Sequence, residues 1–138
     1  MRAFLQLFFL IFYFNLTFSN VTIIPYGSSW KYLDNGTDQG TAWTATGFND
    51  ASWTSGNGQL GYGDGDEATT VSYGTNASNK YITTYFRKTI SVPDISQFTG
   101  YTLSLKRDDG AVVYLNGTEI FRTNMPTGTI NYTTRATV

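Results

Sequence analysis

The chain from Val21 onward has no stretch of a dozen residues whose apolar side chains follow the three- and four-residue spacing of a helix. Gly, Asn, Asp, Ser and Thr recur every few residues, and β-branched and aromatic residues fill the gaps between them. Short β-rich runs separated by turn residues are typical of sandwiches and barrels. The sequence therefore predicts an all-β fold, and with no internal repeat or linker it predicts one domain.

Two strands are predicted between residues 81 and 106. Residues 81–92 (YITTYFRKTISV) are long and β-rich, and Pro93 is expected to end this strand because proline cannot donate to a ladder. Residues 102–106 alternate strictly, which places Tyr101, Leu103 and Leu105 on one face. The other face then carries Thr102, Ser104 and Lys106.

A hairpin is predicted between residues 111 and 122. Residues 108–110 (DDG) turn the chain, and residues 111–115 (AVVYL) are apolar on both faces, as expected of a strand covered on both sides. Asn116-Gly117 then matches the type I′ turn, which needs positive φ at both central residues. Residues 118–122 form the returning strand.

The first half of the chain, residues 30–74, is predicted to hold shorter strands separated by polar loops. Residues 34–40 (DNGTDQG) and 61–67 (GYGDGDE) are the most turn-rich of these loops.

The first 19 residues have the pattern of a secretory signal peptide. Met1-Arg2 forms a short positive start, residues 3–14 are apolar, and Thr17 and Ser19 are small enough to precede a cleavage site. The stretch is short for a bilayer span, which needs about 20 apolar residues. We expect cleavage, an exported module of residues 20–138 and no membrane association afterwards. An uncleaved anchor or a buried helix is the alternative.

The composition excludes several classes of function. The 138 residues include no histidine and no cysteine, so a Ser-His-Asp triad, a cysteine nucleophile and the usual zinc sites are impossible. The formal net charge of −1 gives no electrostatic footprint for nucleic acid or an anionic membrane. We therefore expect a protein that is not an enzyme and does not bind nucleic acid.

Several motifs resemble those of a known group of proteins. Residues 47–53 (GFNDASW) and 107–117 (RDDGAVVYLNG) resemble elements of the galactose-binding-like jelly-roll modules of secreted bacterial multidomain proteins. Those modules are related to the sugar-binding jelly-roll domain of β-galactosidase-type glycosidases. Residues 30–34 (WKYLD) and 60–65 (LGYGDG) match the closer relatives, and residues 85–90 (YFRKTI) match a family strand in part.

The resemblance covers about residues 21–138 and implies an antiparallel β-sandwich of jelly-roll type. The family's last strand pair carries a G-x-N-x-I/V-A-V-E stretch, and nothing after Thr134 matches it. We therefore expect an incomplete sandwich that lacks its last strands, or the front of a longer protein.

The function expected on this basis is that of a non-catalytic, secreted accessory module that binds carbohydrate or docks a neighbouring domain. Two alternatives stay open. One is a structural spacer or adhesion unit without a ligand. The other is the N-terminal part of a secreted hydrolase of the metallophosphoesterase type, whose catalytic domain is not in this sequence.

Aromatic residues beside polar loops are candidates for a sugar-stacking platform, because the C–H face of a pyranose packs on an exposed ring. Arginine can bond sugar hydroxyls or pin a loop by pairing with a carboxylate. Each aromatic residue has burial in the core as its alternative, and for Trp53 we expect the core. The candidate ligand-binding residues are Trp30, Trp43, Tyr62 and Arg107.

Two acidic loops offer the oxygen ligands that suit a structural Ca²⁺, which the resemblance also implies. Asp34 and Asp38 belong to the first loop, and Asp64 and Asp66, with Glu67 beside them, to the second. The alternative is Asx-turns, in which the side chain bonds its own backbone. Asp108 and Asp109 are adjacent in a turn and cannot straddle a sugar as a glycosidase pair does, so we expect a turn-forming role.

Residues 20–138 also contain five Asn-X-Ser/Thr triplets, which are acceptor motifs for N-glycosylation. In a chain rich in Thr and Asn such triplets arise by chance, and we expect no glycosylation in a bacterial-type module. The triplets begin at Asn20, Asn35, Asn76, Asn116 and Asn131.

Overall fold

The computed structural model describes residues 20–92 and 94–137. The predicted signal peptide and the predicted strand end at Pro93 lie outside the described residues. Strand accounts for 23% of the structure and helix for 5%, so the predicted all-β class is confirmed. No helix in the described part of the chain is long and apolar enough to cross a membrane.

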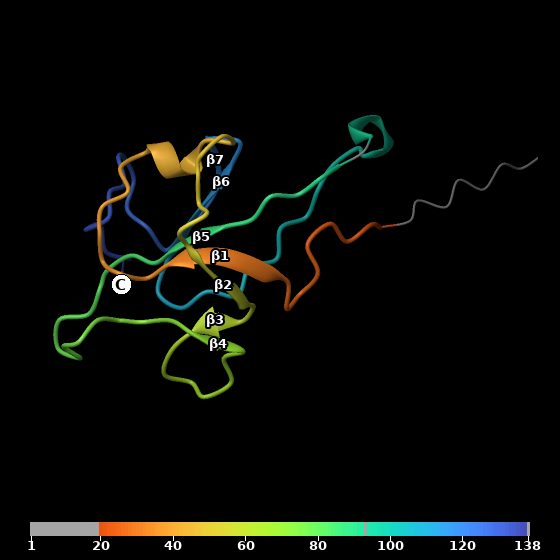
Figure 1. The fold of residues 1–138 in the computed structure, drawn as a ribbon. Helices are drawn as coiled ribbons and strands as arrows, with labels where there is room; N and C mark the ends of the chain where they lie inside the picture. The colour runs from red at the N-terminus through yellow and green to blue at the C-terminus, as the bar shows by residue number, and fades with distance from the viewer. Residues whose placement is uncertain (1–19, 93, 138) are drawn as a thin grey trace, which may run out of the picture.

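A three-stranded antiparallel sheet lies at the centre of the fold (Figure 1). Strand β1 (Ser29–Leu33) lies between β2 (Thr54–Asn57) and β5 (Tyr85–Arg87). In this register Lys31 is paired with Ser55 on one side and with Arg87 on the other. Because directly paired residues point to the same face, these three side chains form a row across the sheet.

A small parallel ladder of β3 (Leu60–Gly61) and β4 (Thr69–Thr70) packs beside this sheet. The contact is tight at Gly56 of β2, where an added Cβ would lie 2.5 Å from Cγ2 of Thr69. The glycine is therefore needed for the close approach of β4.

The predicted hairpin is confirmed. Strands β6 (Ala111–Leu115) and β7 (Thr118–Thr123) pair antiparallel with Leu115 opposite Thr118. The connecting residues Asn116 and Gly117 have φ angles of 51° and 83°, as a type I′ turn requires. The register shifts between Val113 and Tyr114, which marks a β-bulge.

Aromatic rings join the central sheet to this hairpin. Trp43, in the single-turn 3₁₀ helix η1 (Ala42–Thr44), packs its ring edge-on against Tyr85 of β5 and Tyr114 of β6, with centroids 5.1 and 5.6 Å apart. Trp53 packs against Phe48 and Tyr85. Trp53 is 4% exposed, so its predicted place in the core is confirmed. The most buried apolar residues are Tyr32, Trp53, Val71 and Tyr85.

Two predicted strands differ from the structure. Of residues 81–92 only Tyr85–Arg87 form a ladder, and residues 102–106 form none within the described part of the chain. After β5 the chain leaves the sheet, reaches the 3₁₀ turn η2 (Ile95–Gln97) and returns toward β6 (Figure 1). Tyr101, Leu103 and Leu105 accordingly stay 75%, 41% and 43% exposed.

The expectation that residues 111–115 are covered on both faces is also wrong. The first four residues of β6 are half-buried and Leu115 is exposed. This hairpin forms a separate two-stranded sheet, so no further strand extends the layer around it among the described residues.

Candidate functional site

A shallow groove of about 330 Å³ lies along β1 and the end of β5. One aromatic residue, Trp30, contributes to its wall, and the other residues are charged or carry hydroxyl groups. The wall consists of Ser29, Trp30, Lys31, Asp50, Ser55, Arg87, Lys88 and Thr89.

Arg87 is held in place by three contacts. Its Nε donates a hydrogen bond of 2.9 Å to Oδ2 of Asp50, and its Nη1 donates to the backbone carbonyl of Trp43. The guanidinium also lies 5.1 Å from the ring centroid of Phe48. The side chain of Arg87 is 13% exposed and that of Asp50 is 27% exposed, so the arginine is the more buried partner of this ion pair.

The ion pair still offers hydrogen-bonding capacity to the groove. Among the described residues, Nη2 of Arg87 donates to no partner and Oδ1 of Asp50 accepts from none. This fixed pair therefore has one donor and one acceptor that no described residue uses, and protein sites bind ligand hydroxyls through such groups.

Trp30 lies beside the positive end of Lys88, whose Nζ is 5.9 Å from the ring centroid. The same Nζ donates to the carbonyl of Ser29 at 2.8 Å. Lys31 is anchored in a similar way, by a 3.0 Å bond from its Nζ to the carbonyl of Trp53. Both ammonium groups are thus fixed by backbone carbonyls rather than by carboxylates, so their charge is not neutralised by these contacts.

The groove is more positive than the molecule as a whole. It contains the cations Lys31, Arg87 and Lys88 and one carboxylate, Asp50, while the full chain has a formal net charge of −1. A local excess of positive charge favours ligands that carry negative charge.

The other three predicted ligand-binding residues lie in different surroundings from Trp30. The half-buried Trp43 packs its ring on Tyr85 and Tyr114. Tyr62 packs on Tyr73 with centroids 4.9 Å apart, and Nζ of Lys80 lies 4.7 Å from the Tyr62 ring. Arg107 donates to the carbonyl of Asp109 in the turn before β6. The structure does not gather these four residues into one platform.

Sequence reasoning missed Asp50 and Lys88 as groove residues. Asp50 lies 37 positions from its partner Arg87, so no local spacing connects them. Lys88 follows directly after β5, and its place beside Trp30 depends on the β1–β5 pairing. That pairing is the signal that would have revealed it.

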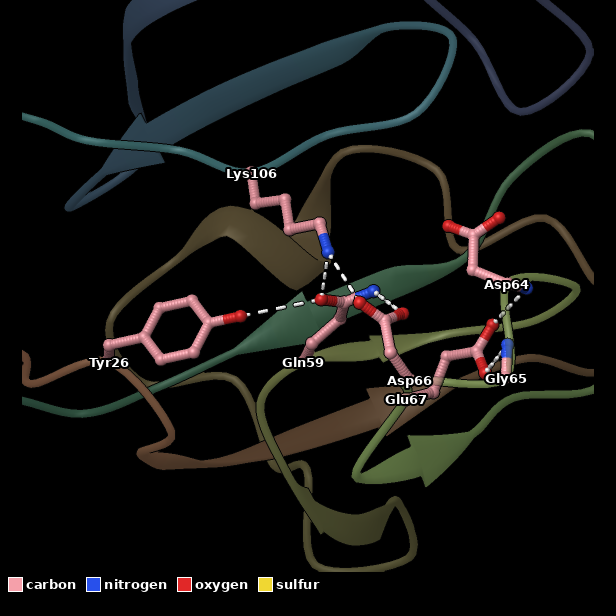
Figure 2. A network of polar contacts seen from close by, with 7 residues as sticks. All are labelled: Tyr26, Gln59, Asp64, Gly65, Asp66, Glu67 and Lys106. Carbon is pink, nitrogen blue, oxygen red and sulfur yellow. Dashed lines mark hydrogen bonds and ion pairs between the residues drawn. The ribbon is translucent and has the colours of Figure 1, made fainter.

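The second acidic loop forms a network of polar contacts (Figure 2). Both carboxylate oxygens of Glu67 accept backbone N–H bonds, from Asp64 and Gly65, each at 2.9 Å. The bond from Asp64 contributes most to lowering the pKa of Glu67 below its usual value. These bonds hold residues 64–67 in a closed loop.

Lys106 connects this loop to the segment that precedes β6. Its Nζ donates to Oδ2 of Asp66 at 3.1 Å and also to the side-chain oxygen of Gln59. The bond from Lys106 lowers the pKa of Asp66, and the same bond raises the pKa of Lys106. Tyr26 donates to the same Gln59 oxygen, as Figure 2 shows.

The predicted calcium ligands fall into two groups. Carboxylate oxygens of Asp64, Asp66 and Glu67 lie within 4.8 Å of one another. The ammonium of Lys106 already pairs with Asp66, and two backbone N–H groups occupy Glu67, so this arrangement fits a salt-bridged loop better than a cation site.

Asp34 and Asp38 are not part of this acidic cluster. Asp34 accepts a bond from the backbone N–H of Ser72, and Asp38 accepts one from Gly40 two residues on, at 2.8 Å. The contact of Asp38 is that of an Asx-turn.

Comparison with protein-family models, with curated proteins and with solved structures found no match to this chain. The resemblance to galactose-binding-like modules therefore rests on the sequence motifs alone.

Proposed function

We propose that this chain is an exported, non-catalytic module that binds carbohydrate in the groove beside Trp30. The observation that carries the proposal is that the wall of one open groove includes both Trp30 and the fixed Asp50–Arg87 pair. A volume of about 330 Å³ is in the range of the smaller ligand pockets, which start at about 300 Å³.

The groove supplies the two kinds of contact that a sugar needs. The C–H face of a pyranose packs on the Trp30 ring, and this excludes water from apolar surface on both partners. A sugar hydroxyl donates to Oδ1 of Asp50 while another accepts from Nη2 of Arg87. Charge-assisted hydrogen bonds of this kind are stronger than neutral ones and fix the orientation of the ring.

The positive excess in the groove favours an acidic polysaccharide. A uronate carboxylate is attracted to Lys31 and Lys88, whose ammonium groups are held by backbone carbonyls. We therefore propose that polyuronates bind more tightly than neutral glycans, and that added salt weakens this difference.

Binding rather than cleavage is proposed because Asp50 is the single carboxylate in the groove wall. A glycosidase needs two carboxyl groups, about 5 Å apart for retention and further apart for inversion. With one carboxylate already paired to Arg87, the groove has no second group to act as acid, base or nucleophile.

The arrangement of the strands in two packed layers is also a proposal. We infer a jelly-roll sandwich from the motif resemblance, and two features of the structure support it. The central sheet is antiparallel, and Trp43 packs between that sheet and the β6–β7 hairpin, as a core between two layers would.

The test compares Trp30→Ala with a matched control, Tyr101→Ala, which removes an aromatic ring that is 75% exposed and lies outside the groove. Affinity for polygalacturonate fragments and for neutral xylan fragments is measured by calorimetry. We expect Trp30→Ala to weaken binding about tenfold, equivalent to about 1.4 kcal/mol, and Tyr101→Ala to leave it unchanged. Equal affinities of the two variants would contradict the groove as the site.

A further inference from the structure

Three of the five Asn-X-Ser/Thr triplets within residues 20–138 share a local conformation. All five asparagines are exposed. Oδ1 of Asn35 accepts bonds from both the backbone N–H and the hydroxyl of Thr37, at 3.1 and 2.7 Å. Oδ1 of Asn131 accepts the same pair from Thr133, at 3.0 and 2.8 Å. At Asn76 the backbone N–H of Ser78 makes the corresponding bond, at 2.9 Å.

This conformation matters for the chemistry of the side-chain amide. The bonds to Oδ1 orient the amide and bring the hydroxyl of residue i+2 next to it. Among the described residues Nδ2 of Asn35 and Nδ2 of Asn131 donate to no partner, so both nitrogens face solvent unpaired. These contacts span two residues only, so they form without the tertiary fold.

Asn116 provides a contrast. It occupies the type I′ turn with a φ of 51°, and its side chain accepts no bond from Thr118 in the described structure. The same triplet therefore occurs with and without the oriented amide in one chain.

We propose that Asn35 and Asn131 are N-glycosylated, contrary to the expectation from the sequence that these triplets arise by chance in a bacterial-type module. The proposal rests on the export proposed above, because the donor is a polyprenyl-diphosphate-linked oligosaccharide of a secretory compartment. Nδ2 attacks C1 of the first sugar and the C1–O bond to the diphosphate breaks. The polyprenyl diphosphate leaves with the electron pair, and Nδ2 loses one proton to a base.

The surroundings of the two sites fit an attached glycan. Both triplets border one small hollow of about 150 Å³, whose wall includes Gly36, Tyr81, Ile82, Tyr132 and Thr133. Tyr81, Ile82 and Tyr132 are 37–38% exposed, and a sugar chain at the rim covers such apolar surface.

This small hollow is separate from the Trp30 groove. No residue of the wall around this small hollow belongs to the Trp30 groove, so glycans at Asn35 and Asn131 leave that groove open.

The experiment expresses the full chain with its own leader in a yeast that N-glycosylates secreted proteins. Protein from the medium is digested with peptide-N-glycosidase in H₂¹⁸O, and labelled aspartate is mapped by mass spectrometry. Asn35 and Asn116 precede glycine and can deamidate spontaneously. The heavy oxygen excludes deamidation before the digest, and a parallel incubation in H₂¹⁸O without the glycosidase measures deamidation during it. We expect label at Asn35 and Asn131, and less at Asn76 and Asn116.

Single variants assign the sites. Thr37→Ala and Thr133→Ala should each abolish label at its own asparagine only, while Thr37→Ser keeps it. Absence of label at both sites, or equal or greater occupancy at Asn76 or Asn116, would overturn the proposal. The same chain behind the host's leader is run in parallel. If the protein reaches the medium with the host's leader but not with its own, the result counts against export. Glycosylation can still be measured on the protein secreted with the host's leader.

Discussion

At the scale of single residues, the loop of residues 34–40 depends on a close contact between Gly36 and the ring of Tyr81. A Cβ at Gly36 would lie 2.4 Å from Cδ1 of Tyr81, and a Cβ at Gly74 would lie 3.0 Å from Cε1 of the same ring. Both glycines also have positive φ, 73° and 93°. Tyr81 is thus held between two backbone segments that no side chain separates.

Gly36→Ala should destabilise the protein more than Gly40→Ala. Gly40 also has positive φ, 56°, but nothing lies within 4 Å of its would-be Cβ. The control therefore measures backbone strain alone, about 1 kcal/mol. Gly36→Ala adds the clash with Tyr81, on the order of 1–3 kcal/mol more. Urea unfolding of both variants gives the difference, and equal losses of stability would show that Tyr81 does not pack on Gly36.

At the scale of elements, Lys106 connects two segments that share no ladder. The segment before β6 contacts the loop of residues 59–67 through the Lys106–Asp66 ion pair, and Glu67 closes that loop with backbone bonds. Both carboxylates have pKa values below their usual values in the folded chain.

Acid should weaken this link. Since the pKa values of Asp66 and Glu67 are lower in the folded state, their contribution to stability is complete above the unfolded pKa values. It is lost as the pH falls below about 4 toward the folded values. The free energy of unfolding of Asp66→Asn should therefore fall less than that of wild type between about pH 7 and about pH 3.

The matched control for the acid experiment is Asp108→Asn, whose carboxylate accepts a bond from the next residue in the turn and pairs with no lysine there. We expect it to keep the wild-type pH dependence in urea unfolding. If Asp66→Asn and wild type lose equal stability in acid, the Lys106–Asp66 pair does not hold the loop.

The elements that sequence predicted well are those specified by local chemistry. The β6–β7 hairpin follows from the positive φ of Asn116 and Gly117, which two adjacent residues determine. Residues 102–106 have an equally clear pattern but no ladder, because alternation sets which face is apolar and not which backbone pairs with it. For the same reason, the β-rich run of residues 81–92 did not show that only Tyr85–Arg87 would pair.

At the scale of the whole molecule, the candidate site is made by pairing across distant segments. Trp30 was predicted from its neighbourhood in the sequence, whereas the Asp50–Arg87 pair and Lys88 depend on how β1, β2 and β5 meet. Trp43 looked equivalent to Trp30 in the sequence, but the structure packs its half-buried ring on Tyr85 and Tyr114. Only the fold distinguishes a tryptophan that lines the groove from one whose ring packs on other aromatic rings.

The indole N–H signals of the three tryptophans test the central claim most directly, because each reports its own surroundings in a ¹⁵N–¹H spectrum. On titration with polygalacturonate fragments, the chemical shift of the Trp30 signal should change with ligand concentration and reach a plateau. The chemical shifts of Trp43 and Trp53 should stay constant. A Trp30 signal that does not respond to acidic or neutral fragments, or three signals that move together, would contradict carbohydrate binding in the groove.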